Sequence, residues 1–536
     1  MVKYRMLARV DETSYPETPI PDWPQSLLDQ YDAKILRPGE VVLGNLPFVR
    51  STVYRTRFLL IPEDIISDAG SFGSIEKALG DFGIGIELPP PLEEIVDDGP
   101  LREHLARLPR PVRLVDRPGG PAVDAWAALQ YLRSVFGTNR GKENQKPTVA
   151  DRISLEHLLC GSLLGWGGVP TYDPHGLTDT AAANYAPPPV RAPVELAGER
   201  PWRNPAWDGN RRRPVVAVLD TGVRNHPWFG DLSGAATAAH PGFLRLFQPS
   251  QVAIAQQEYK VAGLPRSLVL ADSVDAPTTT NPLTDVVNPA VGHGTFIAGV
   301  VHQHAPEADV LMVRVLHPDN VGLEGDVLLA LWLLLARIRD ARTKNTRDWV
   351  DILSLSMGFY DEDPGDGKRS RLAEVIRLLV GEGVVVVASA GNDSTERPFL
   401  PAALGVLDPP PAPGQRVIGV GALNPNGTTA WFSNGGPCAT CHAPGARVIS
   451  TFPPDVNGSA RPGRYVPATG REQADVDDFS SGFAVWDGTS FAAPYIAAEL
   501  ANLMLAIGTD AVATPEDTTA RAAQAVERLR KNAEDR

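Results

Sequence analysis

The chain has 536 residues, 43% of them hydrophobic and 21% charged, a globular composition too long for a single hydrophobic core, so we expect two or three domains. Its formal net charge of −14 argues against broad nucleic-acid binding, because that function needs a basic surface. Three cysteines are too few for a disulfide framework.

The first residues, Met1 to Glu12, lack the apolar stretch of about 7–15 residues that marks a secretory signal. No apolar run reaches the roughly 18 residues that suggest a membrane-spanning helix, and Val327 to Leu335 is far too short. We therefore expect a cytoplasmic protein without a membrane partner.

Residues 1–164 are predicted to form a smaller α+β domain. Alternating or continuous apolar stretches predict its strands, and apolar residues at helical spacing predict its helices. The expected strands are 52–61, 83–88 and 111–115, and the expected helices are 74–82 and 123–136. Residues 165–212 follow as an extended, semi-rigid linker rich in glycine and proline.

Residues 213–510 alternate between apolar strands and helices, which is typical of an α/β fold with a doubly wound parallel sheet and helices on both faces. The expected strands are 214–220, 310–316, 351–357, 384–390 and 416–422. The expected helices are 293–303, 325–339, 370–381 and 489–505. Residues 511–536 are predicted to end the chain as a charged surface helix.

Three polar motifs stand at the ends of these apolar elements. Asp220 ends a buried strand and is followed by Thr221-Gly222, and His293 is flanked by glycines where a helix opens. Ser490 follows Gly488-Thr489 at the start of the Ala-rich run Phe491-Ala492-Ala493-Pro494. Taken alone, Ser490 could simply cap a buried helix. Together, Asp, His and Ser are the orienter, general base and nucleophile of hydroxyl-based catalysis.

The order Asp-Thr-Gly, Gly-His-Gly-Thr, Gly-Thr-Ser-Phe-Ala-Ala-Pro resembles the subtilisin-like serine proteases, the subtilases. The resemblance covers about residues 212 to 510 and suggests an intracellular bacterial type with a large N-terminal extension. It implies a serine endopeptidase with the subtilisin-like fold. In it, Asp220, His293 and Ser490 would hydrolyse peptide bonds through an acyl-enzyme, with no cofactor and no catalytic metal.

The resemblance also implies the remaining parts of the site. Asn392, which follows the apolar run Val384 to Ala388, would donate its amide to the oxyanion, a role whose loss in a subtilisin costs about 2.7–4 kcal/mol. Ser356, Met357 and Gly358 would pair with the substrate backbone, as an added strand does. Ala390 and Gly391 complete the expected substrate-binding set.

The chain departs from the family pattern in two insertions and one helix. Residues 224–290 form an insertion without obvious chemistry, and its histidines, His226 and His240, are expected to be solvated. The helix that begins at His293 runs on without the calcium-binding loop of many secreted relatives, so we expect no strong calcium site there. Residues 452–485 are either a lid over the cleft or a solvated loop.

Two further groups of side chains leave alternatives open. The acidic loop Asp361-Glu362-Asp363 and Glu324 are either solvated or favour basic side chains away from the cut, and Thr221 argues against the dibasic specificity of kexin-like relatives. Cys438 and Cys441 are interpreted as reduced and unremarkable, as a redox-sensitive pair, or as metal ligands with Cys160.

The N-terminal region resembles subtilisin prodomains in its order of elements. We expect it to hold the protease latent until a cleavage or an activating protein partner displaces it. The alternatives are a docking or sensor domain, a constitutively active housekeeping peptidase, and an inert binding scaffold. The linker is interpreted as a spacer, or as a segment that lies across the active site as a substrate mimic.

Overall fold

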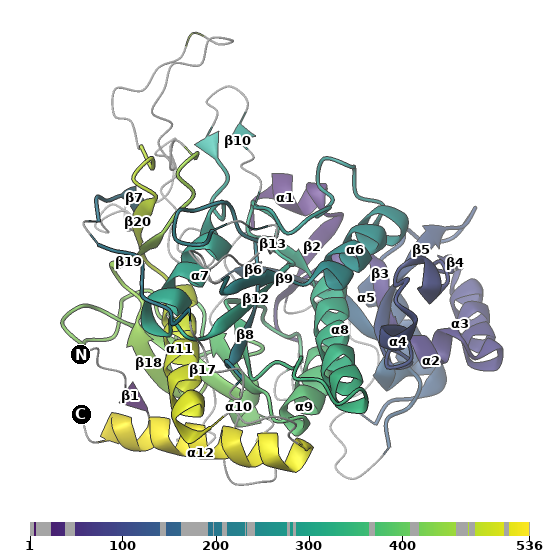
Figure 1. Ribbon diagram of the computed structural model, residues 1–536. Helices are drawn as coiled ribbons and strands as arrows, with labels where there is room; N and C mark the ends of the chain where they lie inside the picture. Colours follow the sequence, from purple (N-terminus) through teal and green to yellow (C-terminus); the bar gives the residue numbers. More distant parts are fainter. Residues whose placement is uncertain are drawn as a thin grey trace.

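The computed structural model describes residues 5–6, 23–37, 49–139, 146–161, 191–196, 198–205, 212–230, 232, 242–275, 279–281, 286–363, 370–407, 417–456, 470, 478–508 and 514–534. Two sheets dominate it. The N-terminal residues lie beside a larger α/β unit, and the two parts are drawn in purple-blue and in teal to yellow (Figure 1).

The N-terminal unit is an antiparallel sheet with helices packed on it. Its strands are β2 (Ala33–Leu36), β3 (Thr52–Pro62), β4 (Ile84–Glu87), β5 (Pro109–Asp116) and β6 (Ser154–Gly161), with β6, β3, β5 and β4 adjacent in that order and β2 on β3. Its helices are α1 (Gln25–Gln30), α2 (Glu63–Ile66), α3 (Ala69–Phe82), α4 (Gly99–Arg102) and α5 (Ala125–Phe136). The strands and helices predicted in this region are therefore confirmed, whereas β6 was not predicted.

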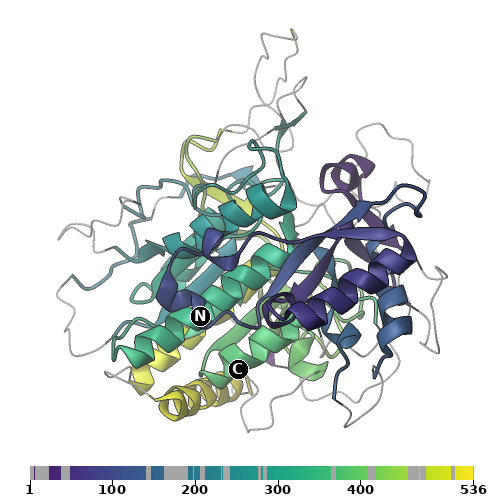
Figure 2. The same cartoon turned by 90° about the vertical axis from the view of Figure 1, so that its right-hand side faces the viewer.

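Local sequence explains where the two long N-terminal helices begin and end. The Asp68 side chain accepts a hydrogen bond from Ser71 N at the start of α3, and Asp124 caps α5 in the same way. Helix α3 ends at Gly83, whose φ of 90° is readily available only to glycine. Both helices lie against the N-terminal sheet (Figure 2). Apolar side chains of both, Ile75 and Leu129 among them, belong to the core of this unit.

The larger unit is built on an eight-stranded sheet in the order β1-β18-β17-β16-β14-β8-β12-β9. Its pairings are parallel except that of β1 with β18. The strands are β1 (Arg5–Met6), β8 (Val215–Asp220), β9 (Leu244–Leu246), β12 (Asp309–Arg314), β14 (Ile352–Leu355), β16 (Val385–Ser389), β17 (Val417–Leu423) and β18 (Cys441–Pro444). The predicted parallel sheet is confirmed, and residues 5–6 extend its edge.

Helices cover both faces of this sheet, as the continuous apolar strands require. On β8, Val216 and Val218 belong to the core shared with α7 (His293–His304), α11 (Thr489–Ile507) and α12 (Pro515–Glu534). Ala217 and Leu219 belong to the core shared with α6 (Gln248–Gln257), α8 (Glu324–Thr343) and α9 (Arg371–Gly381). Among the described residues, α11 alone is long and apolar enough to cross a membrane, but it is mostly buried within this core.

Helix α8 joins the two units because it is apolar on nearly every side. It contacts α6 and α9 of the larger unit, and β5 and β6 of the N-terminal sheet. Two short strands of the larger unit, β13 (Val321–Leu323) and β15 (Met357–Gly358), pair antiparallel with β6. The last strand of the N-terminal sheet is therefore inserted between two segments of the larger unit.

The described part of the linker is packed rather than extended. Its β7 (Ala192–Pro193) pairs with β20 (Phe483–Trp486), which pairs with β19 (Val448–Thr451). Arg203 is buried and donates hydrogen bonds to the carbonyl oxygens of Pro306 and Ala308. The spacer interpretation is wrong for these residues, and 165–190 lie outside the described residues. The short α10 (Leu404–Leu407) and the hairpin of β10 (Thr279–Asn281) and β11 (Val286–Val287) complete the elements.

Candidate active site

Asp220 and His293 form a buried hydrogen-bonded pair at the carboxyl end of the sheet. Asp220 ends β8, and its Oδ1 lies 2.7 Å from Nδ1 of His293, the first residue of α7. The same carboxylate oxygen accepts a hydrogen bond from Thr221 N at 2.8 Å. Because an ionised carboxylate only accepts, the Nδ1 of His293 carries the proton and Nε2 is the basic nitrogen.

Close backbone contact holds the start of α7 against the end of β8. The φ of Gly222 is +89°, and a Cβ on Gly294 would lie only 2.1 Å from the carbonyl oxygen of Gly222. The hydroxyl of Thr221 accepts a hydrogen bond from Gly294 N at 3.0 Å. Both glycines are therefore required for α7 to begin directly beside the end of β8.

Ser490 is the second residue of α11, so it stands in the first turn of this helix, at the positive end of its dipole. Its hydroxyl donates to the carbonyl oxygen of Ser356 at 3.3 Å, and the Ser356 hydroxyl donates to the Ser490 carbonyl at 2.9 Å. Phe491, the next residue, packs against the His293 ring with centroids 5.3 Å apart. The fold therefore brings Asp220, His293 and Ser490 to one place.

Asn392 lies at the same end of the sheet, just after β16. Its side-chain oxygen accepts hydrogen bonds from Thr489 N at 3.0 Å and from the Thr489 hydroxyl at 2.8 Å. These bonds fix the orientation of the Asn392 carboxamide next to Thr489, the residue before Ser490. The geometry suits the oxyanion role expected for Asn392.

Asn434 fixes the loop that carries Asn392. Its side chain donates to Ala390 O at 2.8 Å and accepts from Asp393 N at 2.8 Å and Thr395 N at 3.2 Å. Gly391, with φ of +100°, leaves room for it, because a Cβ there would lie 2.3 Å from Asn434 Nδ2.

Asp275, which lies in the insertion 224–290, was not among the site residues predicted from the sequence. Its Oδ2 accepts hydrogen bonds from Gly292 N and, at 3.3 Å, from the Thr221 hydroxyl. It therefore connects the residue after Asp220 with the residue before His293. Burial raises the pKa of Asp275 to about 6 from the ordinary 3.8. The insertion, which was expected to be without obvious chemistry, therefore supplies a buried carboxylate that joins the segments carrying Asp220 and His293.

The predicted substrate strand is already paired within the chain. Met357 lies opposite Gly161, and Gly358 lies opposite Cys160, in the antiparallel pair of β15 with β6. On the other side, β13 pairs with residues Leu158 to Cys160 of the same strand. Asn320 closes the end of this arrangement by accepting from Gly161 N at 3.3 Å and donating to Gly161 O at 3.0 Å.

Several side chains expected to be solvated are buried. His226 is 4% exposed and bonds through Nε2 to Gly482 O at 2.8 Å, so it packs the insertion against residues 478–486. Burial lowers the pKa of His226 to about 4. Glu324 and Glu362 are 1% and 2% exposed, which makes the solvated interpretation of these two acids wrong. His240 lies outside the described residues.

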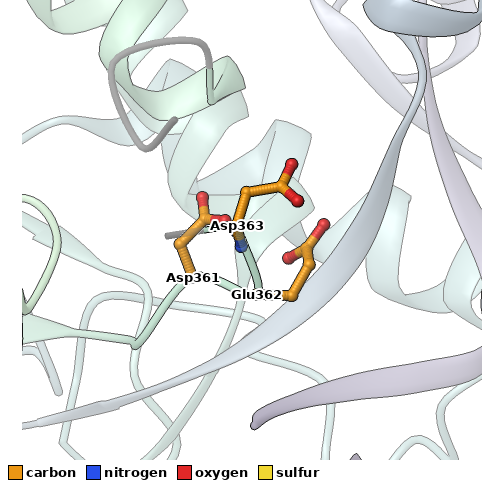
Figure 3. Close-up of side chains that lie close together, drawn as sticks. All are labelled: Asp361, Glu362 and Asp363. Carbon is orange, nitrogen blue, oxygen red and sulfur yellow. Dashed lines mark hydrogen bonds between the residues drawn. The ribbon is translucent and has the colours of Figure 1, made fainter. Parts of the chain in front are cut away.

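Among the described residues, one group of acidic side chains lies close enough together to hold a metal ion. Asp361, Glu362 and Asp363 hold carboxylate oxygens within 4.8 Å of one another (Figure 3). Glu362 is already hydrogen-bonded to His157. Cys160, Cys438 and Cys441 are not joined in disulfides, and the described residues do not bring Cys160 together with the other two into such a group. Burial raises the pKa of Cys441 to about 12, so its thiol stays protonated at neutral pH.

Comparison with known proteins agrees with this geometry. The sequence model of the subtilase family, Peptidase_S8, matches residues 211–536, and the chain belongs to this family. It is 28% identical over 178 residues to the putative subtilase-type proteinase isp6 of Schizosaccharomyces pombe, covering 32% of this chain and 33% of that protein. It is 28% identical over 227 residues to a subtilisin-like protease of Coccidioides posadasii, covering 41% of this chain and 45% of the relative.

A third relative is cerevisin of Saccharomyces cerevisiae, 28% identical over 178 residues, which are 32% of this chain and 26% of cerevisin. The chain thus spans less than half the length of these curated relatives. Among solved structures, a cold-adapted subtilisin-like serine proteinase matches at 19% identity with a TM-score of 0.33, over 57% of this chain and 79% of that one.

Proposed function

We propose that the protein is a serine endopeptidase. Ser490 attacks the scissile carbonyl while His293 Nε2 takes its proton and returns it to the leaving amine. Asp220 holds the His293 tautomer and stabilises the imidazolium, and the oxyanion is bound by the amide of Asn392 and the backbone N–H of Ser490. The observation that carries the proposal is the 2.7 Å Asp220–His293 bond beside the helix N-terminus that bears Ser490.

The finer part of the proposal is that the intact chain is latent. Strand β6 occupies the position between β13 and β15 where a substrate strand would bind. Ser490 and His293 are both 0% exposed, so a peptide cannot reach them while this arrangement holds. Either cleavage after β6 or displacement of the N-terminal sheet by a protein partner would open the site.

Intact mass tests both parts in one experiment. Wild-type protein and Ser490→Ala are incubated in parallel, with Ser480→Ala, an exposed serine near the end of the insertion, as the matched control. Gly161, the last residue of β6, lies opposite Met357 in β15, the strand expected to bind the substrate. We therefore expect a serine-dependent cut a few residues after Gly161 in wild type and in Ser480→Ala.

Loss of the same fragment from Ser490→Ala would refute the assignment of Ser490. Full activity of the uncut wild-type chain on casein would refute latency and support a housekeeping peptidase. A wild-type chain that stays intact and inactive, yet becomes active when a partner binds, would support displacement without cleavage.

A further inference from the structure

One histidine of β6 is enclosed by two acids of the larger unit. His157 Nδ1 lies 2.6 Å from Glu324 Oε2, and His157 Nε2 lies 2.8 Å from Glu362 Oε2. Glu324 begins α8, and Glu362 follows β15, so the two carboxylates reach the ring from different elements. All three side chains are at most 4% exposed.

This arrangement requires a positive charge at its centre. An ionised carboxylate only accepts hydrogen bonds, so an imidazole bonded to two of them must donate from both nitrogens, which is the imidazolium form. Burial acts to lower the pKa of His157, but Glu324 and then Glu362 outweigh it, so this pKa lies well above the ordinary 6.5. The two acids therefore hold a buried cation between them.

The ring also packs on an apolar surface, because it stacks on Phe359 with centroids 4.5 Å apart. Glu324 has a second role, since its Oε2 accepts from His157 N at 3.1 Å and so holds the strand backbone as well. Glu362, in contrast, bonds the imidazole ring of His157, so this contact depends on which side chain stands at position 157. Substitution of Glu362 therefore tests recognition of the side-chain charge more directly than substitution of Glu324.

We propose that Glu324 and Glu362 form a distal subsite for a basic substrate side chain, which His157 fills in the intact chain. The inference rests on the proposed peptidase function and specifies its substrate class. When β6 leaves, two buried carboxylates would face each other with no cation between them, and that is costly. A substrate that supplies Arg or Lys there restores the pairing, and the five donors of Arg suit two carboxylates.

The strand register gives the position of this basic residue relative to the nucleophile. His157 is four residues before Gly161, which lies opposite Met357, and Met357 follows Ser356, the residue bonded to Ser490. In a substrate strand of the same register, the basic side chain lies five residues before the residue opposite Ser356. Selection therefore occurs well upstream of the cut, separate from any preference at the cleaved bond.

Peptide cleavage tests the specificity. We would use peptides with the sequence of residues 153–170 that carry Arg, Lys, Gln or Glu at position 157, and the processed wild-type enzyme titrated with a fluorophosphonate. A charge-assisted contact predicts kcat/KM about ten-fold or more higher for Arg than for Gln, and lowest for Glu. Glu362→Gln should remove most of this preference, whereas Asp363→Asn, which removes an equal charge in the same loop, should retain it.

Equal cleavage of the Arg and Gln peptides by an enzyme that the fluorophosphonate labels would overturn the subsite while leaving the peptidase proposal intact. Absence of both labelling and cleavage would instead count against the peptidase proposal, and a second measurement then tests the subsite without catalysis. It uses hydrogen–deuterium exchange of residues 154–161 in the full chain carrying Ser490→Ala.

In that background, His157→Arg should keep the exchange protection of β6, and His157→Gln should reduce it about ten-fold, as expected for loss of a charge-assisted contact. Glu362→Gln should reduce protection when residue 157 is His or Arg, but hardly at all with His157→Gln. Protection that depends on neither charge would overturn the inference.

Discussion

Asp275 offers a pH-dependent test of how the insertion 224–290 supports the Asp220–His293 pair. Burial raises its folded-state pKa to about 6, and the unfolded chain returns to about 3.8. At about 1.36 kcal/mol per pKa unit, ionising Asp275 in the fold costs about 3 kcal/mol. Because the folded-state pKa is raised, the stabilising contribution is complete below about pH 4 and is lost as pH rises through about 6.

The assay is chemical unfolding followed by tryptophan fluorescence, in the Ser490→Ala background to prevent self-cleavage. Relative to the protein that retains Asp275, Asp275→Asn should gain up to about 3 kcal/mol of unfolding free energy between about pH 4 and about pH 7, because Asn cannot ionise. The control is Asp272→Asn, which changes the same charge at an exposed position. If the difference in unfolding free energy between the two proteins stays constant across this pH range, the reasoning is refuted.

Three further substitutions test residues that form the candidate active site or hold the segments around it in place. If the Asn392 amide binds the oxyanion as proposed, Asn392→Leu should lower kcat by about 10²–10³-fold with little change in KM, which steady-state kinetics of the processed enzyme would check. Asn434→Ala should lower the unfolding free energy by about 1–3 kcal/mol for each buried group of the 390–395 loop left unpaired, measured by urea unfolding. Arg191→Leu leaves the carbonyl oxygens of Asn288, Pro289 and Val291 without this donor, so a lower melting temperature is expected by calorimetry, and an unchanged one would contradict the assigned contacts.

The parallel sheet and its helices were predictable because each element has a strong local signal. Strand β8 is a continuous apolar run that ends in Asp220, and α11 begins at Thr489 within a run of small apolar residues. Both faces of the parallel sheet are buried, so its strands are continuous apolar runs that can be recognised in the sequence. The motifs at the element ends then placed Asp220, His293 and Ser490 at one edge of the sheet.

Strand β6 was not predictable in the same way. Its sequence, Ser-Leu-Glu-His-Leu-Leu-Cys-Gly, buries both apolar and charged residues, so it has no regular alternation. Its conformation depends on β3, β13 and β15, which are distant in sequence. The burial of Glu324 and Glu362 has the same origin, because His157 supplies their partner. Local patterns carry no information on such pairings.

Asp275 and Asn434 show a second limit of sequence reasoning. Each acts by hydrogen-bonding backbone groups of another segment, and neither stands in a motif with recognisable chemistry. A buried Asp in an insertion has the same local sequence as a solvated one. Only the three-dimensional contact between the insertion and Gly292 distinguishes the two.

The central claim of the proposal is that Ser490 is a nucleophile and that β6, paired with β13 and β15, keeps substrates from it, and the reactivity of Ser490 with a fluorophosphonate tests this most directly. The labelling rate is compared between the full wild-type chain and Leu159→Asp, which places a charge at a buried β6 position 1% exposed, each with and without Ser490→Ala. The account predicts slow labelling of wild type, faster labelling of Leu159→Asp, and none in either Ser490→Ala protein. Equal labelling rates with and without the Leu159 substitution, or labelling that survives Ser490→Ala, would contradict it.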